Sequence, residues 1–175
     1  MNNLKQIGVA GRVWADDHGD LYPPEVSVTT GGTKEIFSRG SRFQNLAFLQ
    51  YLALSNELAT PKILHCASDT DGFAATNFSP GFCNRNVSYF VGLNAATNSP
   101  QTLDAGDDNF EINGVPVKSG MLELPTNAPV SWTTARHHKT GNILLGDGSV
   151  QQATSSSLRT AWQQTGLTTN RLVIP

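Results

Sequence analysis

The histidines and carboxylates of this chain are the residues whose lone pairs and pKa values could support catalysis or metal binding. Arg136, His137 and His138 are consecutive in the sequence. On a strand, two adjacent histidine side chains project to opposite faces, so this pair could not easily hold one metal ion together. We expect a structural pair at the end of a sheet, with Arg136 hydrogen-bonded to a nearby carboxylate.

Two groups of acidic residues are candidates for calcium. Asp69-Thr70-Asp71-Gly72 is similar to the start of a calcium loop, but EF-hand spacing would require Asp or Asn near Phe73 and Glu at Pro80. That interpretation therefore fails. A different oxygen cage is conceivable, although a solvated acidic loop is the favoured interpretation. Its four candidate ligands are Asp104, Asp107, Asp108 and Glu111.

Other sequence signals of chemistry are absent. The chain has no Gly-x-Ser-x-Gly elbow, no Ser-x-x-Lys pair and no phosphate-binding glycine loop followed by lysine. Its net charge is -2 and its 12 Lys and Arg residues are dispersed, which argues against a nucleic-acid partner. We expect a protein that is not an enzyme.

The two cysteines, Cys66 and Cys83, flank a stretch rich in Gly, Ser, Thr, Asn and Asp. A disulfide closing this loop would contribute about 3 kcal/mol on the chain-entropy model, in an oxidising compartment. Two free thiols in a reduced protein are the alternative. No Cys-x-x-Cys pair or Cys-His cluster in the sequence indicates zinc.

Length and composition favour one domain outside the cytoplasm. The chain has 175 residues, and charged residues make up 15 % of it, against roughly 25 % in average globular proteins. Asn, Thr, Ser and Gly replace them, as in proteins with long polar loops. There is no apolar run of about 18 residues to span a membrane, and no signal peptide at the start.

The elements that would position these residues belong to an α+β domain. Residues 2–18 are predicted to form an amphipathic helix with a stripe of Leu4, Ile7, Gly11 and Trp14, ended by Gly19. Val9 and Val13 lie on the opposite side of this helix. They are either tolerated surface valines or a second face covered by a partner.

A second helix is predicted from Ser41 to about Leu58, because Ser41 and Gln44 have the spacing of a capping box. Residues 63–66 favour a strand or an extended anchor. Residues 87–93 alternate with period two and predict a strand, and residues 121–124 predict another. Asn113-Gly114 favours a hairpin turn.

The strongest local signal is a hairpin over residues 142–151, which begins at Asn142. Asp147-Gly148 suits a two-residue type I′ turn, which would place Leu145 opposite Val150. Residues 155–157 can cap a short helix that bears Leu158, Ala161 and Trp162 and stops at Gly166. A final extended piece covers residues 172–174.

The opening residues 1–8, Met-Asn-Asn-Leu-Lys-Gln-Ile-Gly, resemble the segment that follows the hydrophobic prepilin helix in bacterial pseudopilin-like proteins related to the type II secretion major pseudopilin. Further motifs fall in the order found in that class. They are Trp14-Ala15-Asp16-Asp17-His18-Gly19, the prolines after Leu21-Tyr22, Cys66-Ala67-Ser68-Asp69, Ser88-Tyr89, Arg136-His137-His138, Gly141-Asn142 and Asp147-Gly148-Ser149-Val150. One departure is Ala67, where the class commonly has proline.

This resemblance to type IV pilin-like proteins implies a pilin-like soluble headpiece. A preceding hydrophobic helix would be cleaved and methylated by a prepilin peptidase and would anchor the subunit in the inner membrane. The partners would be other pilin-like subunits in a periplasmic or envelope filament, and members of the class can bind calcium near the sheet. Residues 1–18 would be the distal part of the long helix, and residues 19–175 the head.

Two functions of other classes remain open from the sequence. One is a glycan- or peptide-binding module that uses aromatic residues of the loops, namely Tyr22, Phe78, Phe82 and Trp132. The other is a metal-assisted hydrolase that uses His65, His138 and the acidic loop.

Overall fold

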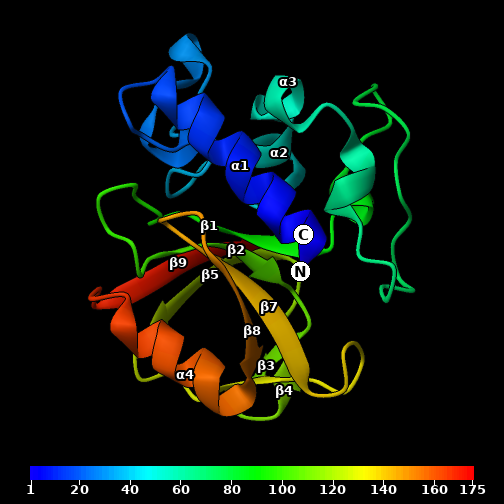
Figure 1. Cartoon of the computed structure of the whole chain (residues 1–175), viewed down its shortest axis with the longest axis vertical. Helices are drawn as coiled ribbons and strands as arrows, with labels where there is room; N and C mark the ends of the chain where they lie inside the picture. Colours follow the sequence, from blue (N-terminus) through cyan, green and yellow to red (C-terminus); the bar gives the residue numbers. More distant parts are fainter.

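A six-stranded antiparallel sheet with strand order β5-β9-β1-β2-β7-β8 runs through the middle of the protein (Figure 1). The computed structural model describes residues 1–175 and has an α+β fold. The strands of this sheet are β1 (Tyr89–Gly92), β2 (Leu103–Asp107), β5 (Gly120–Pro125), β7 (Thr140–Leu145), β8 (Val150–Thr154) and β9 (Thr169–Ile174).

A second sheet has three strands in the order β4-β3-β6. The Asn113-Gly114 hairpin is confirmed, because both residues have positive φ (52° and 76°) and Ile112 pairs with Val115 across the turn. Sequence patterns did not predict the third strand of this sheet. The strands are β3 (Phe110–Ile112), β4 (Val115–Pro116) and β6 (Val130–Trp132).

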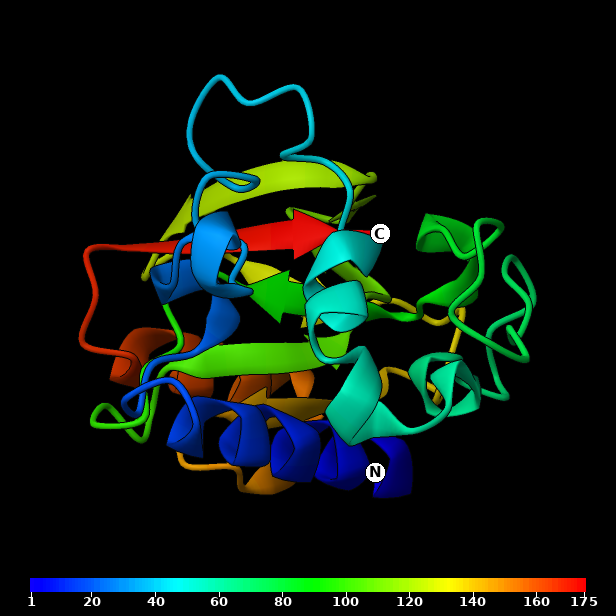
Figure 2. The ribbon, with the colours of Figure 1, turned by 90° about the horizontal axis from the view of Figure 1, so that it is seen from above.

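Helices cover both faces of the large sheet (Figures 1 and 2). Helix α1 lies on one face beside α2 and α3, and α4 lies on the other face together with the small sheet. None of these helices combines the length and apolarity needed to cross a bilayer. Their bounds are α1 (Asn2–Asp16), α2 (Phe48–Ala53), α3 (Ser55–Leu58) and α4 (Ser155–Gln164), with 3-10 turns η1 (Pro23–Glu25), η2 (Val28–Thr30), η3 (Pro61–Leu64) and η4 (Asn84–Asn86).

Strand β1 shows how the large sheet contributes side chains to two hydrophobic cores, one on each face. Its side chains alternate between the two faces, since successive residues of a strand point in opposite directions. Tyr89 and Val91 belong to the core on the α1 side, and Phe90 belongs to the core on the α4 side. All four residues of the strand are buried. The predicted strand is confirmed, and its near-continuous apolar character reflects a sheet covered on both faces.

The predicted N-terminal helix is confirmed, with Leu4, Ile7, Gly11 and Trp14 on its buried side. The predicted strand at residues 121–124 is confirmed as part of β5, and the final extended piece belongs to β9. The C-terminal helix is confirmed as α4, but its predicted cap was wrong by at least one residue: the Thr154 side chain accepts from Ser157 N–H, and residues 155–157 lie within the helix. The sequence of each of these segments has a clear hydrophobic or capping pattern, which explains why local reasoning predicted them.

The prediction of one helix from Ser41 to about Leu58 was wrong. Ser41 Oγ accepts from Phe43 N–H rather than from Gln44, and α2 begins only at Phe48. Asn45 is held by long-range bonds, since its Oδ1 accepts from Met121 N–H of β5 and its carbonyl from Asn84. These contacts keep the segment before Phe48 in turns, which local propensity could not anticipate.

The segment at residues 63–66 is not a strand. Pro61 opens the 3-10 turn η3, and Thr60 Oγ1 accepts from Lys62 N–H. Only at His65 does the backbone become extended (φ -104°, ψ 129°). Proline is favoured at the start of a helical turn, because its missing N–H would have no partner there.

The 142–151 hairpin forms, but its predicted register was wrong by one residue. Leu144, rather than Leu145, pairs with Val150, and Gly148 N–H donates to the Leu145 carbonyl. Gly148 has a positive φ (83°), whereas Asp147 does not, so the two-residue type I′ turn is excluded. The loop instead has three residues, with glycine in the left-handed position.

Candidate functional site

The outward side of α1 is the first candidate surface. The helix buries Leu4, Ile7 and Trp14 on the sheet side, each with at most 4 % of its surface exposed. Val9 and Val13 point away from the sheet and are 64 % and 49 % exposed. Residues four apart are neighbours on a helix surface, so these two valines form one apolar stripe.

A shallow groove adjoins this stripe. Lys5, Val9 and Ala10 of α1 form one wall, while α3 and the segment after it form the other. Apolar side chains line most of the groove, and Glu57 and Lys5 add charge at its margin. The opposite wall consists of Glu57, Leu58, Ala59 and Ile63. The surface therefore combines an exposed apolar stripe with a recess of a size that a side chain of a partner could enter.

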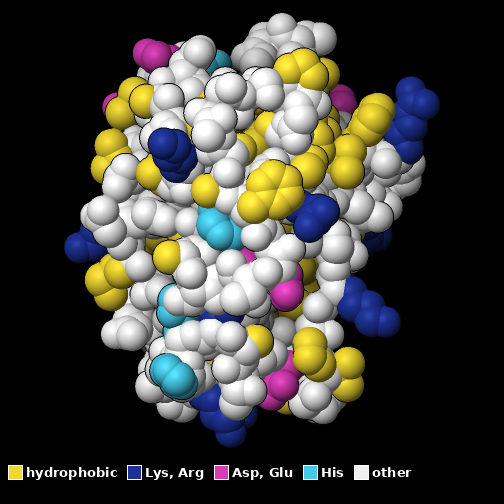
Figure 3. All heavy atoms as spheres, turned by 90° about the vertical axis from the view of Figure 1, so that its right-hand side faces the viewer, with side chains coloured by type: hydrophobic (Ala, Val, Ile, Leu, Met, Phe, Trp, Pro, Cys, Tyr) yellow, Lys and Arg dark blue, Asp and Glu magenta, His cyan; other side chains and the backbone are white.

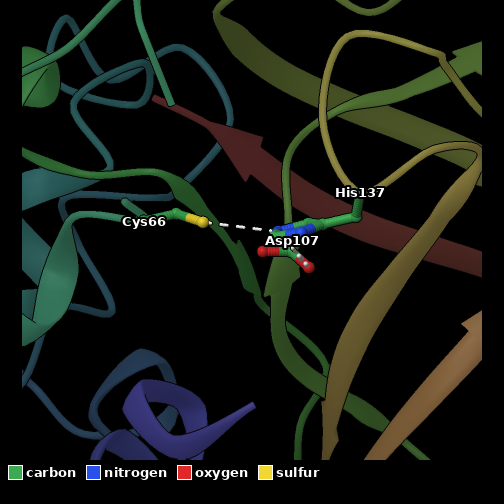
Figure 4. Close-up of side chains that lie close together, drawn as sticks. All are labelled: Cys66, Asp107 and His137. Atoms are coloured by element: carbon green, nitrogen blue, oxygen red, sulfur yellow. Dashed lines mark hydrogen bonds and ion pairs between the residues drawn. The ribbon is translucent and has the colours of Figure 1, made fainter. Parts of the chain in front are cut away.

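A second candidate site brings together Cys66, Asp107 and His137 (Figure 4). Cys66 follows η3, Asp107 ends β2, and His137 lies in the turn before β7. Cys66 Sγ lies 3.3 Å from His137 Nε2, and Asp107 Oδ2 lies 3.8 Å from the same nitrogen. One potential ligand atom from each residue lies within 4.8 Å of the other two.

Asn142 fixes the carboxylate of this cluster. Its backbone N–H and its side-chain amide both donate to Asp107 Oδ2, at 2.7 and 2.9 Å. Cys66 is held in a similar way, because its N–H donates to Ser88 Oγ at 2.9 Å. The Ser88 hydroxyl in turn donates to Asp69 Oδ2 at 2.7 Å. Hydrogen bonds from neighbouring residues therefore fix the positions of Asp107 and Cys66 in the cluster.

The turn that carries His137 has an unusual backbone. His137, His138 and Lys139 are consecutive and all have positive φ (52°, 51° and 62°). Non-glycine residues rarely adopt this conformation, and it costs roughly 1–2 kcal/mol per residue. The two histidines therefore lie in a turn just before β7 and not on a strand. In this turn His137 faces Cys66 and Asp107, and it remains 25 % exposed.

The face on the right of Figure 1 is drawn in full in Figure 3. Histidine side chains are visible down the middle of this face, and apolar side chains gather above them. Among the exposed apolar residues of the 66–86 loop is Phe73, which is 50 % exposed and lies under the Arg85 guanidinium. Of the Cys66, Asp107 and His137 cluster, the His137 side chain is 25 % exposed, so the cluster is accessible from solvent at that residue.

Arg136 links two buried carboxylates. Its guanidinium forms ion pairs with Asp69, at 2.9 Å, and with Asp108. The prediction that Arg136 binds a nearby carboxylate is confirmed. Burial raises the pKa of Asp108 to about 7, and the positive charge of Arg136 opposes this rise. All three side chains are at most 13 % exposed, so their charges interact in a region of low dielectric.

The favoured interpretation of residues 104–111 as a solvated acidic loop is wrong, because Asp104 and Asp107 lie in β2, Glu111 lies in β3, and all four carboxylates are buried or half-buried. The alternative, a four-carboxylate cage, does not form either. Asp107 joins Cys66 and His137, Asp108 pairs with Arg136, and Glu111 accepts from the Ser131 hydroxyl. Asp104 lies beside a small cavity between α1 and the sheet, where burial raises its pKa to about 7. The carboxylates separate because Glu111 belongs to the small sheet and the other three contact different neighbours.

The expected Cys66–Cys83 disulfide is not formed, and both cysteines are free thiols. Cys66 faces His137, as described above. Cys83 instead precedes η4, where its backbone N–H donates to Asn86 Oδ1 at 2.9 Å. The loop between the cysteines is ordered by hydrogen bonds of other groups, including Asn86 Nδ2 to the Phe73 carbonyl.

Two further candidate sets of the sequence are not assembled into sites. Of the loop aromatics, Tyr22, Phe82 and Trp132 are buried, with at most 6 % of their surface exposed, and cannot stack on a glycan. Phe78 packs edge-on against Phe82. His65 contacts the Ser88 hydroxyl, while His138 is not part of the cluster around Cys66.

The approach of Cys66 to His137 is the feature that sequence reasoning missed. The two residues are 71 positions apart, so no local spacing links them. Each belongs to its own motif. Cys66 is bonded to Ser88, just before β1, and the pairing of β1 with β2 and of β2 with β7 brings it close to the turn that carries His137. Comparisons of the chain with models of protein families, with curated proteins and with solved structures give no match.

Proposed function

We propose that this protein is a structural subunit of a cell-envelope filament or secretion pseudopilus, and that it assembles with other pilin-like subunits through α1. An apolar helix preceding this segment would anchor the subunit in the inner membrane and place its head in the periplasm. The proposal follows the order of motifs described above, from the N-terminal Met-Asn-Asn-Leu-Lys-Gln-Ile-Gly to Asp147-Gly148.

One observation supports it most directly: α1 uses one side to dock on the sheet and leaves an apolar stripe on the other. Single exposed valines are ordinary on protein surfaces. Val9 and Val13, however, share one helix face, and Val9 also lines the groove against α3. Burying both against a neighbouring helix would remove apolar area from water, which contributes roughly 25 cal/mol per Å².

The two rival functions have less support. A binding module would need exposed aromatic rings, whereas three of the four candidates are buried in the core. A hydrolase using His65 and His138 would need these residues close to a shared metal ion, whereas the potential metal ligands that cluster are Cys66, Asp107 and His137.

The test is a charge substitution in the natural full-length protein, expressed from its own gene in its native host. Val9→Asp together with Val13→Asp should abolish self-association, because two carboxylates cannot be buried in an apolar contact. Val115→Asp is the matched control, since Val115 is 63 % exposed but lies on β4 of the small sheet. Chemical cross-linking of the cell envelope reports assembly.

Unchanged cross-linking in the Val9 and Val13 double variant would contradict assembly through α1. Sequencing the gene upstream of Met1 tests the class of protein separately. We expect a prepilin-type cleavage motif followed by an apolar stretch long enough to cross the bilayer. An upstream coding region without such a stretch would contradict membrane anchoring.

A further inference from the structure

The geometry points to a zinc-class metal site formed by Cys66, Asp107 and His137, a site independent of the proposed assembly function. Thiolate, imidazole and carboxylate are all common ligands of Zn²⁺. Calcium is excluded as the preferred ion, because it takes oxygen ligands only. The sequence contained no zinc motif, since the three ligands come from three distant segments.

The two distances to His137 Nε2 are close to those around a shared metal ion. In a tetrahedral zinc site with bonds of about 2.0–2.3 Å, the ligand atoms lie about 3.3–3.6 Å apart. Here Cys66 Sγ and Asp107 Oδ2 lie 3.3 and 3.8 Å from His137 Nε2. Small side-chain movements would complete the geometry.

The direction of approach argues against a catalytic relay. In a nucleophile–histidine–acid triad the nucleophile and the acid contact opposite nitrogens of the ring. In this protein the thiol and the carboxylate both approach Nε2 (Figure 4). The N–H at Nε2 can form a good hydrogen bond with either the thiol or the carboxylate but not with both, whereas a metal ion bound to Nε2 could bind both groups.

Charge balance also favours a cation. Asp107 is 1 % exposed, and the only basic group within ion-pair distance is His137. Arg136 does not serve this purpose, because its guanidinium contacts Asp69 and Asp108. A buried carboxylate without a cation is unfavourable, and a divalent ion would compensate it.

The residues around the cluster hold its side chains by hydrogen bonds, as the neighbours of metal ligands commonly do. The amide donors of Asn142 orient Asp107, and Ser88 Oγ holds the backbone N–H of Cys66. The left-handed backbone from His137 to Lys139 is a strained feature of the kind that gathers at functional sites. It aims the imidazole at the other two residues.

The ion would join three segments: the loop after η3, the end of β2 and the turn before β7. Binding would replace the thiol proton of Cys66, which is released to solvent as the thiolate bonds to the metal. Water would be the fourth ligand, since the His137 side chain is 25 % exposed to solvent.

Purified protein, kept reduced and dialysed against Zn²⁺, should retain one equivalent of zinc. Chelator competition should show affinity at least about tenfold weaker in Cys66→Ser and in His137→Asn, and Asp107→Asn should also weaken it. Cys83→Ser and His138→Asn are matched controls and should bind like the wild type. Asparagine is used because it tolerates the left-handed backbone at positions 137 and 138.

A second measurement does not depend on the folding of any variant. Co²⁺ bound to the wild-type protein should give a near-ultraviolet thiolate-to-metal absorption band. Absence of this band, substoichiometric zinc in the wild type, or equal affinity of the Cys66 and Cys83 variants would overturn the site. A Cys66–Cys83 disulfide in protein from its native source, seen as the loss of two hydrogens in intact mass, would also overturn it.

Discussion

Gly8 of α1 lies so close to Leu144 of β7 that a β-carbon at position 8 would be 2.7 Å from Leu144 Cδ1. The Gly148 carbonyl is the next neighbour, at 3.3 Å, and as backbone it cannot move aside easily. The absence of a side chain at position 8 therefore sets how closely the N-terminal helix approaches the sheet.

Replacing Gly8 by valine should destabilise the fold by about 1–3 kcal/mol, because the helix must lift from β7. This loss should exceed the roughly 0.5–1 kcal/mol by which glycine disfavours a helix interior. Urea unfolding measures the difference. Gln6→Val, on the exposed side of the same helix, should change stability by no more than about 0.5 kcal/mol. Equal effects of the two substitutions would show that the contact with Leu144 is unimportant.

Replacing Asp104 by asparagine should change the pH dependence of stability. Burial raises the pKa of Asp104 from 3.8 to about 7, so the folded state favours the protonated carboxyl. The associated stability is fully present below the unfolded pKa and is lost as pH rises through about 7. Relative to the wild type, Asp104→Asn should be more stable at pH 8 than it is at pH 4.

The measurement is the unfolding free energy of both proteins at each pH. Asp16→Asn, an exposed substitution near the end of α1, is the control and should show no such trend. A constant difference between wild type and Asp104→Asn from pH 4 to pH 8 would contradict the raised pKa. Tyr22, whose pKa is raised to about 12 by burial and then by the charge of Asp104, lies beside the same cavity.

Replacing Arg136 by methionine should cost about 3–5 kcal/mol, because Asp69 and Asp108 would be left as uncompensated buried charges. Arg39 is the contrasting case, since it pairs with Glu123 while its own side chain is 80 % exposed. Arg39→Met should therefore cost no more than about 1 kcal/mol. Denaturant unfolding at pH 8 compares the two, and similar losses would refute a special role for the buried network.

Two features of the candidate sites could be predicted from the sequence, whereas the grouping of the carboxylates and cysteines could not. The apolar stripe of Val9 and Val13 was predicted, because helical periodicity alone places them opposite Leu4 and Ile7. The pairing of Arg136 with a carboxylate was also predicted, though not which carboxylate. The acidic loop was predicted to be solvated, with an oxygen cage as the alternative, and the Cys66–Cys83 disulfide was expected; the structure instead distributes those residues among separate contacts.

The sequence by itself determined the elements whose cause is local: the amphipathic stripe of α1, the Asn113-Gly114 turn and helix α4, although not which residue caps α4. In each, neighbouring residues supply both the pattern and the hydrogen bonds. Only the tertiary structure decided that residues 41–47 remain in turns, because Asn45 is bonded to β5 and Asn84. It also decided that Cys66, Asp107 and His137 meet, since this contact depends on the bond from Cys66 to Ser88 and on the pairing of β1, β2 and β7, and has no local sequence signature.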